Sequence, residues 1–123
     1  MSNHIKPVIQ AQKAQVLIND YLIVKAGTSE DQVTLAVLDD KPFGAAQVQQ
    51  QLNQPQAGDV IEVAVYGGCY VKLGGTVAKG DSIMPNAASK GIAGTSGKWC
   101  VGVADEAGVD GDIIAVRIFI HKA

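Results

Sequence analysis

The sequence predicts a mainly β protein, a small single-domain barrel or sandwich built from short strands. Of the 14 glycines, all but one lie at or after Gly44, where they separate short apolar runs rich in β-branched residues. Glycine adopts the positive φ that tight turns need, so this spacing is typical of strands joined by hairpins. A length of 123 residues with 47% hydrophobic residues suits one domain with its own core.

Residues 1–20 differ from the rest of the chain because they keep neither helical nor strand periodicity. Glutamines and Pro7 interrupt their apolar residues, and a proline disfavours helix at the residue before it. We interpret this stretch as an extended N-terminal arm and residues 21–123 as the β-rich domain. A frayed terminus is the alternative to an arm that packs on something outside its own domain.

From residue 16 onward the chain reads as strands separated by turn residues. Apolar runs at residues 16–18 and 21–24 flank Asn19 and Asp20, a pair suited to a bulge or bend. Turn-forming residues then occupy 25–29. The β-branched run at 32–38 predicts the next strand.

Residues 43–56 are the one place where a short helix is expected. Ala45, Val48 and Leu52 recur at helical spacing between glutamines, before Pro55 stops any continuation. A glutamine-rich loop on the barrel surface is the alternative. The sequence therefore predicts at most one short helix.

The second half of the chain is more regular. Glycine-rich turns separate five expected strands, at residues 60–65, 69–73, 82–84, 99–104 and 113–121. Gly67 and Gly68 are expected to form a turn between the first two of these strands. Residues 91–97 are expected to form a loop, of the kind that often contacts partners.

A faint internal repeat also runs through the sequence. Each copy has a strand containing a glycine, a variable loop, and a Gly-Asp turn leading into a β-branched strand. The first copy comprises residues 43–46 and 57–63, and the second comprises residues 101–104 and 110–116. We interpret the copies as two related hairpins that close on each other. Loose repetition common to glycine-rich β proteins is the alternative.

Charge and hydropathy exclude several classes of function. The chain has 10 Lys and Arg against 12 Asp and Glu, and its lysines are scattered singly. Proteins that grip nucleic acid usually carry a basic patch, so direct nucleic-acid binding is not expected. No apolar run is long enough to span a bilayer, and no signal segment opens the chain, so a soluble protein without membrane contact is expected.

Nothing in the sequence spacing indicates a catalytic, phosphate or metal site. Cys69 and Cys100 form no CxxC motif and lie in apolar runs, which favours buried free thiols over a disulfide. His4 and His121 are both near chain ends, and neither adjoins a serine or cysteine in sequence. Gly97 followed by Lys98 lacks the rest of a Walker motif. No enzyme activity and no cofactor are therefore expected.

Paired carboxylates provide the basis for one alternative. Asp110 and Asp112, like the pairs at 39–40 and 105–106, lie in polar turn segments where aspartate caps the backbone. We interpret them as turn residues, and a small carbohydrate-binding β domain that uses such turns is the alternative function.

Residues 75–83 look like the hairpin of biotinyl and lipoyl carrier domains. The nearest candidate for a modified lysine is Lys90, without the family's flanking pattern, and Lys79 is the second candidate. The shared element is a turn, but a carrier module stays open as an alternative function.

The pattern of the second half resembles the capsid cement, or head decoration, proteins of tailed bacteriophages. The resemblance covers residues 24–120. The residues that carry it are 60–68, 80–83, 101–104 and 111–116. Residues 43–46 look like the family's first Gly-Val-Ala element, with Phe43 and Ala45 as departures.

This resemblance implies a β-barrel or β-tulip domain on the outer surface of the expanded phage head, in the mature virion. It implies the major capsid protein as partner and a homo-oligomer, with a trimer favoured over a dimer. It also implies that the N-terminal arm lies on the shell, and the candidate capsid-binding residues are His4, Ile5, Pro7, Val8 and Ile9. On this reading, deletion of residues 1–20 leaves a folded domain that no longer binds capsids.

Overall fold

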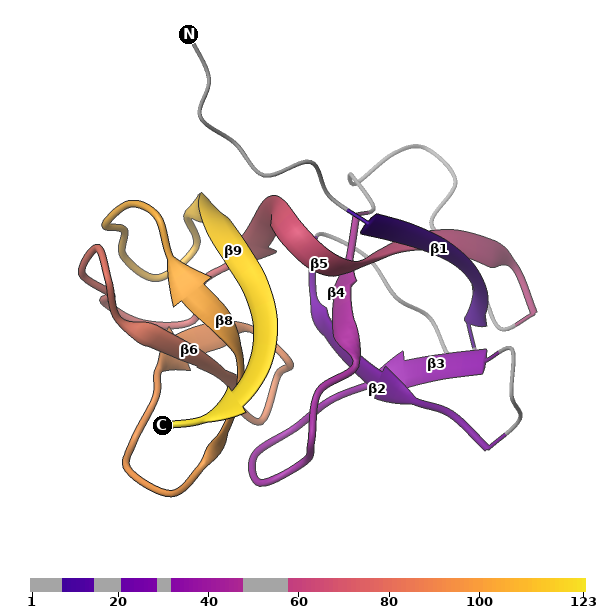
Figure 1. The fold of residues 1–123 in the computed structure, drawn as a ribbon, viewed down its shortest axis with the longest axis horizontal. Helices are drawn as coiled ribbons and strands as arrows, with labels where there is room; N and C mark the ends of the chain where they lie inside the picture. Colours follow the sequence, from indigo (N-terminus) through magenta and orange to yellow (C-terminus); the bar gives the residue numbers. More distant parts are fainter. Residues whose placement is uncertain (1–7, 15–20, 29–31, 48–57) are drawn as a thin grey trace, which may run out of the picture.

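The computed structural model describes residues 8–14, 21–28, 32–47 and 58–123. Over these residues the chain is all β, arranged as two lobes that lie side by side (Figure 1). The predicted fold class is confirmed. The strands are β1 (Val8–Ala14), β2 (Ile23–Ala26), β3 (Gln32–Leu35), β4 (Gly44–Ala46), β5 (Val60–Lys72), β6 (Ser82–Pro85), β7 (Gly91–Ala93), β8 (Trp99–Ala104) and β9 (Ile113–Lys122). Among the described residues there is no helix long and apolar enough to cross a membrane.

The first lobe is a closed five-stranded barrel. Its strands follow the order β1-β3-β2-β4-β5, and β1 also pairs with β5, which closes the ring. The β1–β3 pair is parallel and the other pairs are antiparallel. Closure leaves the barrel without an unpaired edge strand. The side chains that fill its interior are Ala14, Val24, Val33, Ala46, Ile61 and Val63.

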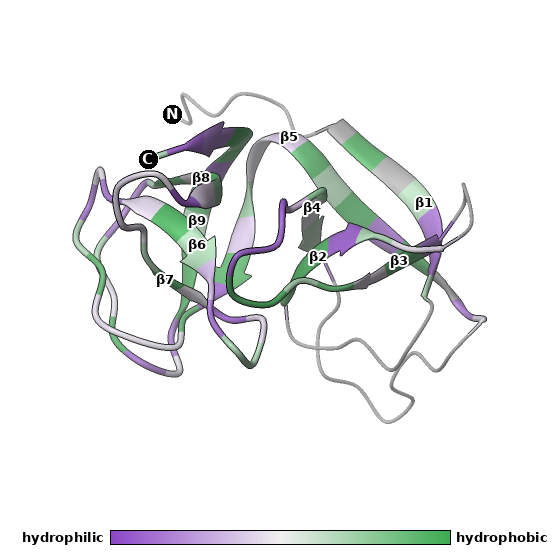
Figure 2. Ribbon diagram, turned by 90° about the horizontal axis from the view of Figure 1, so that it is seen from below, coloured by the Kyte–Doolittle hydropathy of each residue, from purple (hydrophilic) through white to green (hydrophobic). Residues whose placement is uncertain are grey.

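The second lobe is built in the same way around the other half of β5. Its strands follow the order β5-β9-β8-β6-β7, and its two edges meet through a parallel bridge between Leu73 and Gly91. Buried aliphatic side chains such as Val71, Ile83 and Ile118 fill the interior. In Figure 2 the hydrophobic colour recurs along β5 in both lobes. This strand is therefore a wall of both barrels.

The two barrels repeat each other pair by pair. In the first barrel, Ala45 on β4 pairs with Ala64 on β5. In the second, Val103 on β8 pairs with Arg117 on β9. These are the positions that an alignment of the two sequence repeats makes equivalent. The faint repeat is thus a structural duplication, with β1, β2, β3, β4 and the first half of β5 matching the second half of β5, β6, β7, β8 and β9.

Backbone conformation follows the same duplication. Tyr21 has a φ of 58° where the equivalent Gly80 has 92°, and Asp39 has 72° where the equivalent Gly97 has 81°. A positive φ is disfavoured for residues with a Cβ atom. The first barrel therefore holds side chains at two strained turns that the second barrel builds with glycine, which is one reason why the repeat is faint in sequence.

Two turns expected from glycine content are strands in the structure. Gly67 and Gly68 lie inside β5, where Gly67 has a φ of 85° and pairs with Ile118. The strand leaves one barrel and enters the other at this place, and glycine permits the change of direction. Gly91–Ala93, expected as the start of a loop, is β7 and pairs with β6.

The segment expected to be helical begins as a strand. Gly44–Ala46 is β4, fully buried between β2 and β5. Gly44 allows this close approach, because a Cβ atom there would lie 2.2 Å from the carbonyl oxygen of Ala64. Residues 48–57 lie outside the described part of the chain.

Part of the predicted arm belongs to the first barrel. Val8–Ala14 is β1, which pairs antiparallel with β5 and parallel with β3. Among its described side chains only Ala14 is buried in the core, while Ile9, Ala11 and Lys13 are exposed. A strand with so little apolar alternation carries no periodic signal, so the expected domain start at residue 21 comes too late. Residues 1–7 and 15–20 lie outside the described residues.

The barrels are joined by an apolar interface on the outer side of the first barrel. Ile23, Ala45 and Ala64 form a row across β2, β4 and β5. Together with Ala36, they are fully buried and belong to the same cluster as the core of the second barrel. Three of the four are alanines, so the side chains leave room for the two lobes to approach closely.

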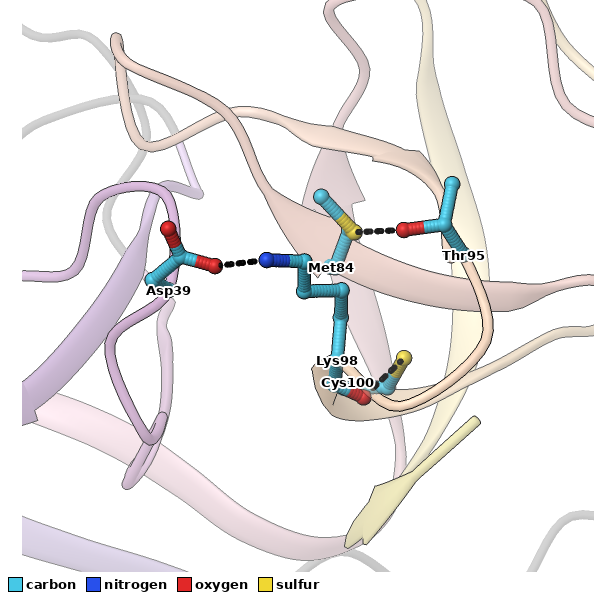
Figure 3. A network of polar contacts seen from close by, with 5 residues as sticks. All are labelled: Asp39, Met84, Thr95, Lys98 and Cys100. Carbon is cyan, nitrogen blue, oxygen red and sulfur yellow. Dashed lines mark hydrogen bonds and ion pairs between the residues drawn. The ribbon is translucent and has the colours of Figure 1, made fainter.

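Polar contacts reinforce this junction. Lys98 of the second lobe forms an ion pair with Asp39 of the first (Figure 3). The Gln47 side chain donates to the Tyr70 carbonyl oxygen at 3.0 Å and accepts from the Tyr70 N–H at 3.1 Å. The Gln47 side chain of the first lobe thereby satisfies the backbone N–H and carbonyl oxygen of Tyr70 in the second.

Asp40, in the loop between β3 and β4, makes the stability of the protein depend on pH. Its carboxylate accepts a hydrogen bond from the Val37 N–H and pairs with Lys25, both at 3.0 Å. The Val37 hydrogen bond and then Lys25 lower the pKa of Asp40. A lowered pKa in the folded state stabilises the protein above the ordinary pKa of aspartate, and this contribution is lost as pH falls through the lowered value.

Asp40→Asn is therefore expected to reduce the free energy of unfolding at pH 7 and to have little effect at pH 2, as measured by urea unfolding. An equal loss at both pH values would contradict this assignment.

Candidate interaction surface

The sequence-predicted capsid-binding residues are only partly described by the structure. His4, Ile5 and Pro7 lie outside the described residues. Val8 begins β1 and its backbone pairs with Tyr66 on β5, while Ile9 pairs with Ala64 and is 39% exposed. The described part of this set therefore lies beside the place where β5 crosses between the barrels.

Two exposed aromatic residues lie at that crossing. Tyr66 directly precedes Gly67, and Phe119 directly follows Ile118, the strand partner of Gly67. Tyr66 is 52% exposed and Phe119 is 40% exposed. With Ile9 they form what we call the seam cluster. Exposed aromatic residues that keep a large apolar area are enriched in protein interfaces.

Tyr66 and Phe119 occupy equivalent positions in the two barrels, on β5 and β9. Their sequence pattern alone did not mark them as binding residues. Strand alternation carries the signal, because Val63 and Val65 line the core of the first barrel and Tyr66 follows on the opposite, outward face. Recognition of that signal requires knowing that β5 continues through Gly67.

The outer face of β5 and β9 extends this apolar surface. Tyr70 is 52% exposed and lies edge-on to Tyr21, with 6.1 Å between the ring centroids. Ile113 pairs with Lys72 on the neighbouring strand and is 45% exposed. The surface therefore offers several aromatic and aliphatic side chains on one pair of strands.

A serine and a histidine meet in the second barrel, which the sequence did not indicate. The His121 ring hydrogen-bonds the Phe119 carbonyl oxygen through Nδ1 at 3.0 Å. A carbonyl oxygen only accepts, so Nδ1 carries a proton, and in the neutral imidazole Nε2 then accepts from the Ser82 hydroxyl at 2.9 Å. His121 also stacks on Phe119, with 4.6 Å between centroids. The pair links β6 to β9 across β8.

Asp112, one of the carboxylates expected to cap turns, does so, and Asp81 caps a further turn. Asp81 accepts a hydrogen bond from the Ala78 N–H, and Asp112 accepts one from the Val109 N–H, both at 2.9 Å. Asp110 is exposed in the same turn as Asp112. Among the described residues, no group of three or more His, Cys, Asp or Glu side chains is placed to hold a metal ion.

The two candidate carrier lysines lie in different surroundings. Lys79 is exposed in the turn closed by Asp81, and Lys90 is half-buried. The Lys90 N–H donates to the side-chain oxygen of Asn86 at 3.0 Å, in the turn before β7. Of the two, Lys79 is the more accessible to a modifying enzyme.

Both cysteines are free and buried, as expected. Burial raises the pKa of the Cys69 thiol to about 12 and also raises that of Cys100. A thiol reacts as its thiolate, so both cysteines are expected to resist 5,5′-dithiobis(2-nitrobenzoic acid) at pH 8 in the folded protein and to react in 8 M urea. Rapid labelling of the folded protein would contradict the burial of these side chains.

Of the comparisons with known proteins, the one with solved structures gives matches. No family model matches the chain, and no curated protein matches it. The chain is similar to the solved structure of the head fiber gp8.5 N base of bacteriophage phi29, with a TM-score of 0.70 and 18% sequence identity. The match covers 93% of this chain and 95% of that chain. At this identity the likeness shows a shared fold.

Proposed function

We propose that this protein is a structural component of a bacteriophage head, a cement protein that decorates the outer surface of the expanded shell. The observation that carries the proposal is the likeness to the phi29 head fiber base, which extends over both barrels. The short strand and turn signatures of the cement family point to the same class of protein. In this role the chain acts by binding and has no catalytic step.

The seam cluster suits contact with the major capsid protein. Ile9, Tyr66 and Phe119 expose apolar area on three neighbouring strands, β1, β5 and β9, and burying such area on a partner stabilises a complex. A ligand that binds the expanded lattice and not its dissociated subunits stabilises that lattice by mass action. Assembly of the protein as a homo-oligomer, a trimer or a dimer, would add avidity on a repeating surface.

The direct test is the protein content of purified virions. Mass spectrometry of virions of the phage that encodes this chain is expected to find it at hundreds of copies per particle, and protease treatment of intact virions is expected to cleave it. Its absence from virions, despite its presence in the infected lysate, would overturn the proposal.

A second experiment tests the binding surface. Tyr66→Ser/Phe119→Ser is expected to abolish co-sedimentation with expanded heads, because it removes the largest exposed side chains of the seam cluster. Leu38→Ser/Val109→Ser is the matched control, since these residues are 48% and 53% exposed and lie outside the strands that carry the seam cluster. Equal binding by both variants would remove the seam cluster from the proposed interface.

A second candidate within this class is the base of a head fiber. It is favoured by the description of the structural neighbour, which is the base part of a fiber protein. Immunogold electron microscopy separates the two, because a cement protein labels the shell evenly and a fiber base labels the foot of discrete projections.

A further inference from the structure

The duplication makes one surface of the second barrel equivalent to an interface that the first barrel buries. In the first barrel, the row Ile23, Ala45 and Ala64 is fully buried against the second barrel. The equivalent row in the second barrel runs across β6, β8 and β9. It consists of Ser82, Val103 and Arg117, which pair in the same register.

This second row, which we call the outer row, is not buried, and its polar groups make contacts within the same lobe. His121 accepts the hydrogen bond from Ser82 and stacks on Phe119. Arg117, whose side chain is 48% exposed, lies 3.8 Å from the Asp105 carboxylate. Polar and charged groups therefore stand where the first barrel has isoleucine and alanine.

We propose that the outer row has the geometry of a docking face for a further barrel. The polar side chains of Ser82, Arg117 and His121 prevent a barrel from docking there in the unmodified protein. The occupant that fits is the first barrel of a second copy of this chain. The argument is continuity with the interface inside the chain, because the same fold buries the equivalent row against a barrel of the same kind. In repeat proteins, polar residues on the outer face of the terminal repeat likewise prevent further copies from stacking on it.

The duplication also identifies the surface of the second copy that would dock. Within one chain, the second barrel meets the first through the Lys72 N–H, which donates to the Tyr21 carbonyl oxygen at 3.1 Å, and through the Tyr70 backbone held by Gln47. The equivalents of Tyr70 and Lys72 in the first barrel are Ala11 and Lys13. Both are exposed.

Contact between these two different surfaces is head-to-tail. Such a contact adds copies without limit unless the rotation closes a ring. Burial of Arg117 in an apolar interface opposes association, because desolvation of its guanidinium is unfavourable and the contact with Asp105, at 3.8 Å and partly exposed, is too weak to offset it. Arg117 is therefore placed to prevent open-ended growth of the protein through this face.

The test replaces two residues of the outer row by the residues that occupy the equivalent positions in the first barrel. Ser82→Ile/Arg117→Ala is expected to give concentration-dependent association in sedimentation velocity, at least tenfold tighter than any self-association of the unmodified chain. Adding Ala11→Arg, which puts a long charged side chain on the docking surface of the other copy, is expected to reverse this. Arg117→Ala alone, the milder change, is expected to give weaker association and serves if the double variant fails to fold.

Thr76→Ile/Lys79→Ala is the matched control, because both residues are exposed elsewhere on the second barrel. Equal association of this control, no association of either outer-row variant in folded form, or failure of Ala11→Arg to suppress association would each overturn the proposal. The experiment uses the isolated chain, so its result does not depend on capsid binding.

Discussion

Gly102→Ala is expected to lower the free energy of unfolding by about 3 kcal/mol, the upper end of the cost of overpacking. A Cβ atom at Gly102 would lie 2.1 Å from the Arg117 carbonyl oxygen and 2.9 Å from its carbonyl carbon. Both are backbone atoms of β9, so relief requires moving a strand that is paired on both sides. Thermal and urea unfolding followed by circular dichroism measure the effect.

Gly75→Ala is the matched control for this substitution. A Cβ atom there would meet only the tip of the Ile92 side chain, at 3.4 Å, and Gly75 has no positive φ. Its expected cost is below about 1 kcal/mol, as for ordinary surface changes. If Gly102→Ala unfolds at the same urea concentration as the control, β8 and β9 do not approach each other as closely at Gly102 as described.

Gly44→Ala extends the argument to the first barrel. Gly44 is the equivalent of Gly102, and its Cβ atom would lie 2.2 Å from the carbonyl oxygen of Ala64, the equivalent of Arg117. Both barrels therefore need a residue without a side chain at one place, where β4 pairs with β5 in the first barrel and where β8 pairs with β9 in the second. This shared requirement explains why the first strand of each copy of the sequence repeat contains a glycine.

The sequence was most informative where turns and strands alternate regularly. In the second barrel, with glycine at most of its turns, the strands expected at residues 82–84, 99–104 and 113–121 are present, whereas β7 lies in an expected loop. The two copies of the repeat fall on equivalent strands. Asp81 and Asp112 cap turns as their sequence context indicates. Local chemistry determines these features, so they are visible in a single sequence.

Features that depend on tertiary context were not predictable in this way. β1 places a single described side chain in the core, and its strand conformation follows from pairing with β3 and β5. Gly67 was expected to be a turn residue because a glycine pair usually marks one, whereas it bends a strand that serves two barrels. The seam cluster lies at this crossing, so it was invisible for the same reason.

Deletion of residues 1–14 is expected to unfold the first barrel, contrary to the expectation from sequence that residues 1–20 are dispensable for folding. The deletion removes β1, which closes the ring between β3 and β5. It also removes the hydrogen bonds that Ala14 makes with Asp59 and Gly58, at 2.8 and 2.7 Å. Open strand edges and an uncovered core follow. Since Ile23 and Ala64 of this barrel pack in the cluster of the other, loss of cooperative unfolding by the whole chain is expected in thermal melts.

Deletion of residues 1–7 separates folding from binding, because it leaves every described strand in place. This shorter variant is expected to melt within about 2 °C of the full chain, a shift that corresponds to less than 1 kcal/mol for a domain of this size. Capsid co-sedimentation of the same variant then tests the role of His4, Ile5 and Pro7 alone. Loss of binding with an unchanged melt assigns these residues to the interface, and retained binding removes them from it. If the 1–14 deletion melts like the full chain, β1 is not part of the barrel, and the larger truncation becomes a valid test of the arm.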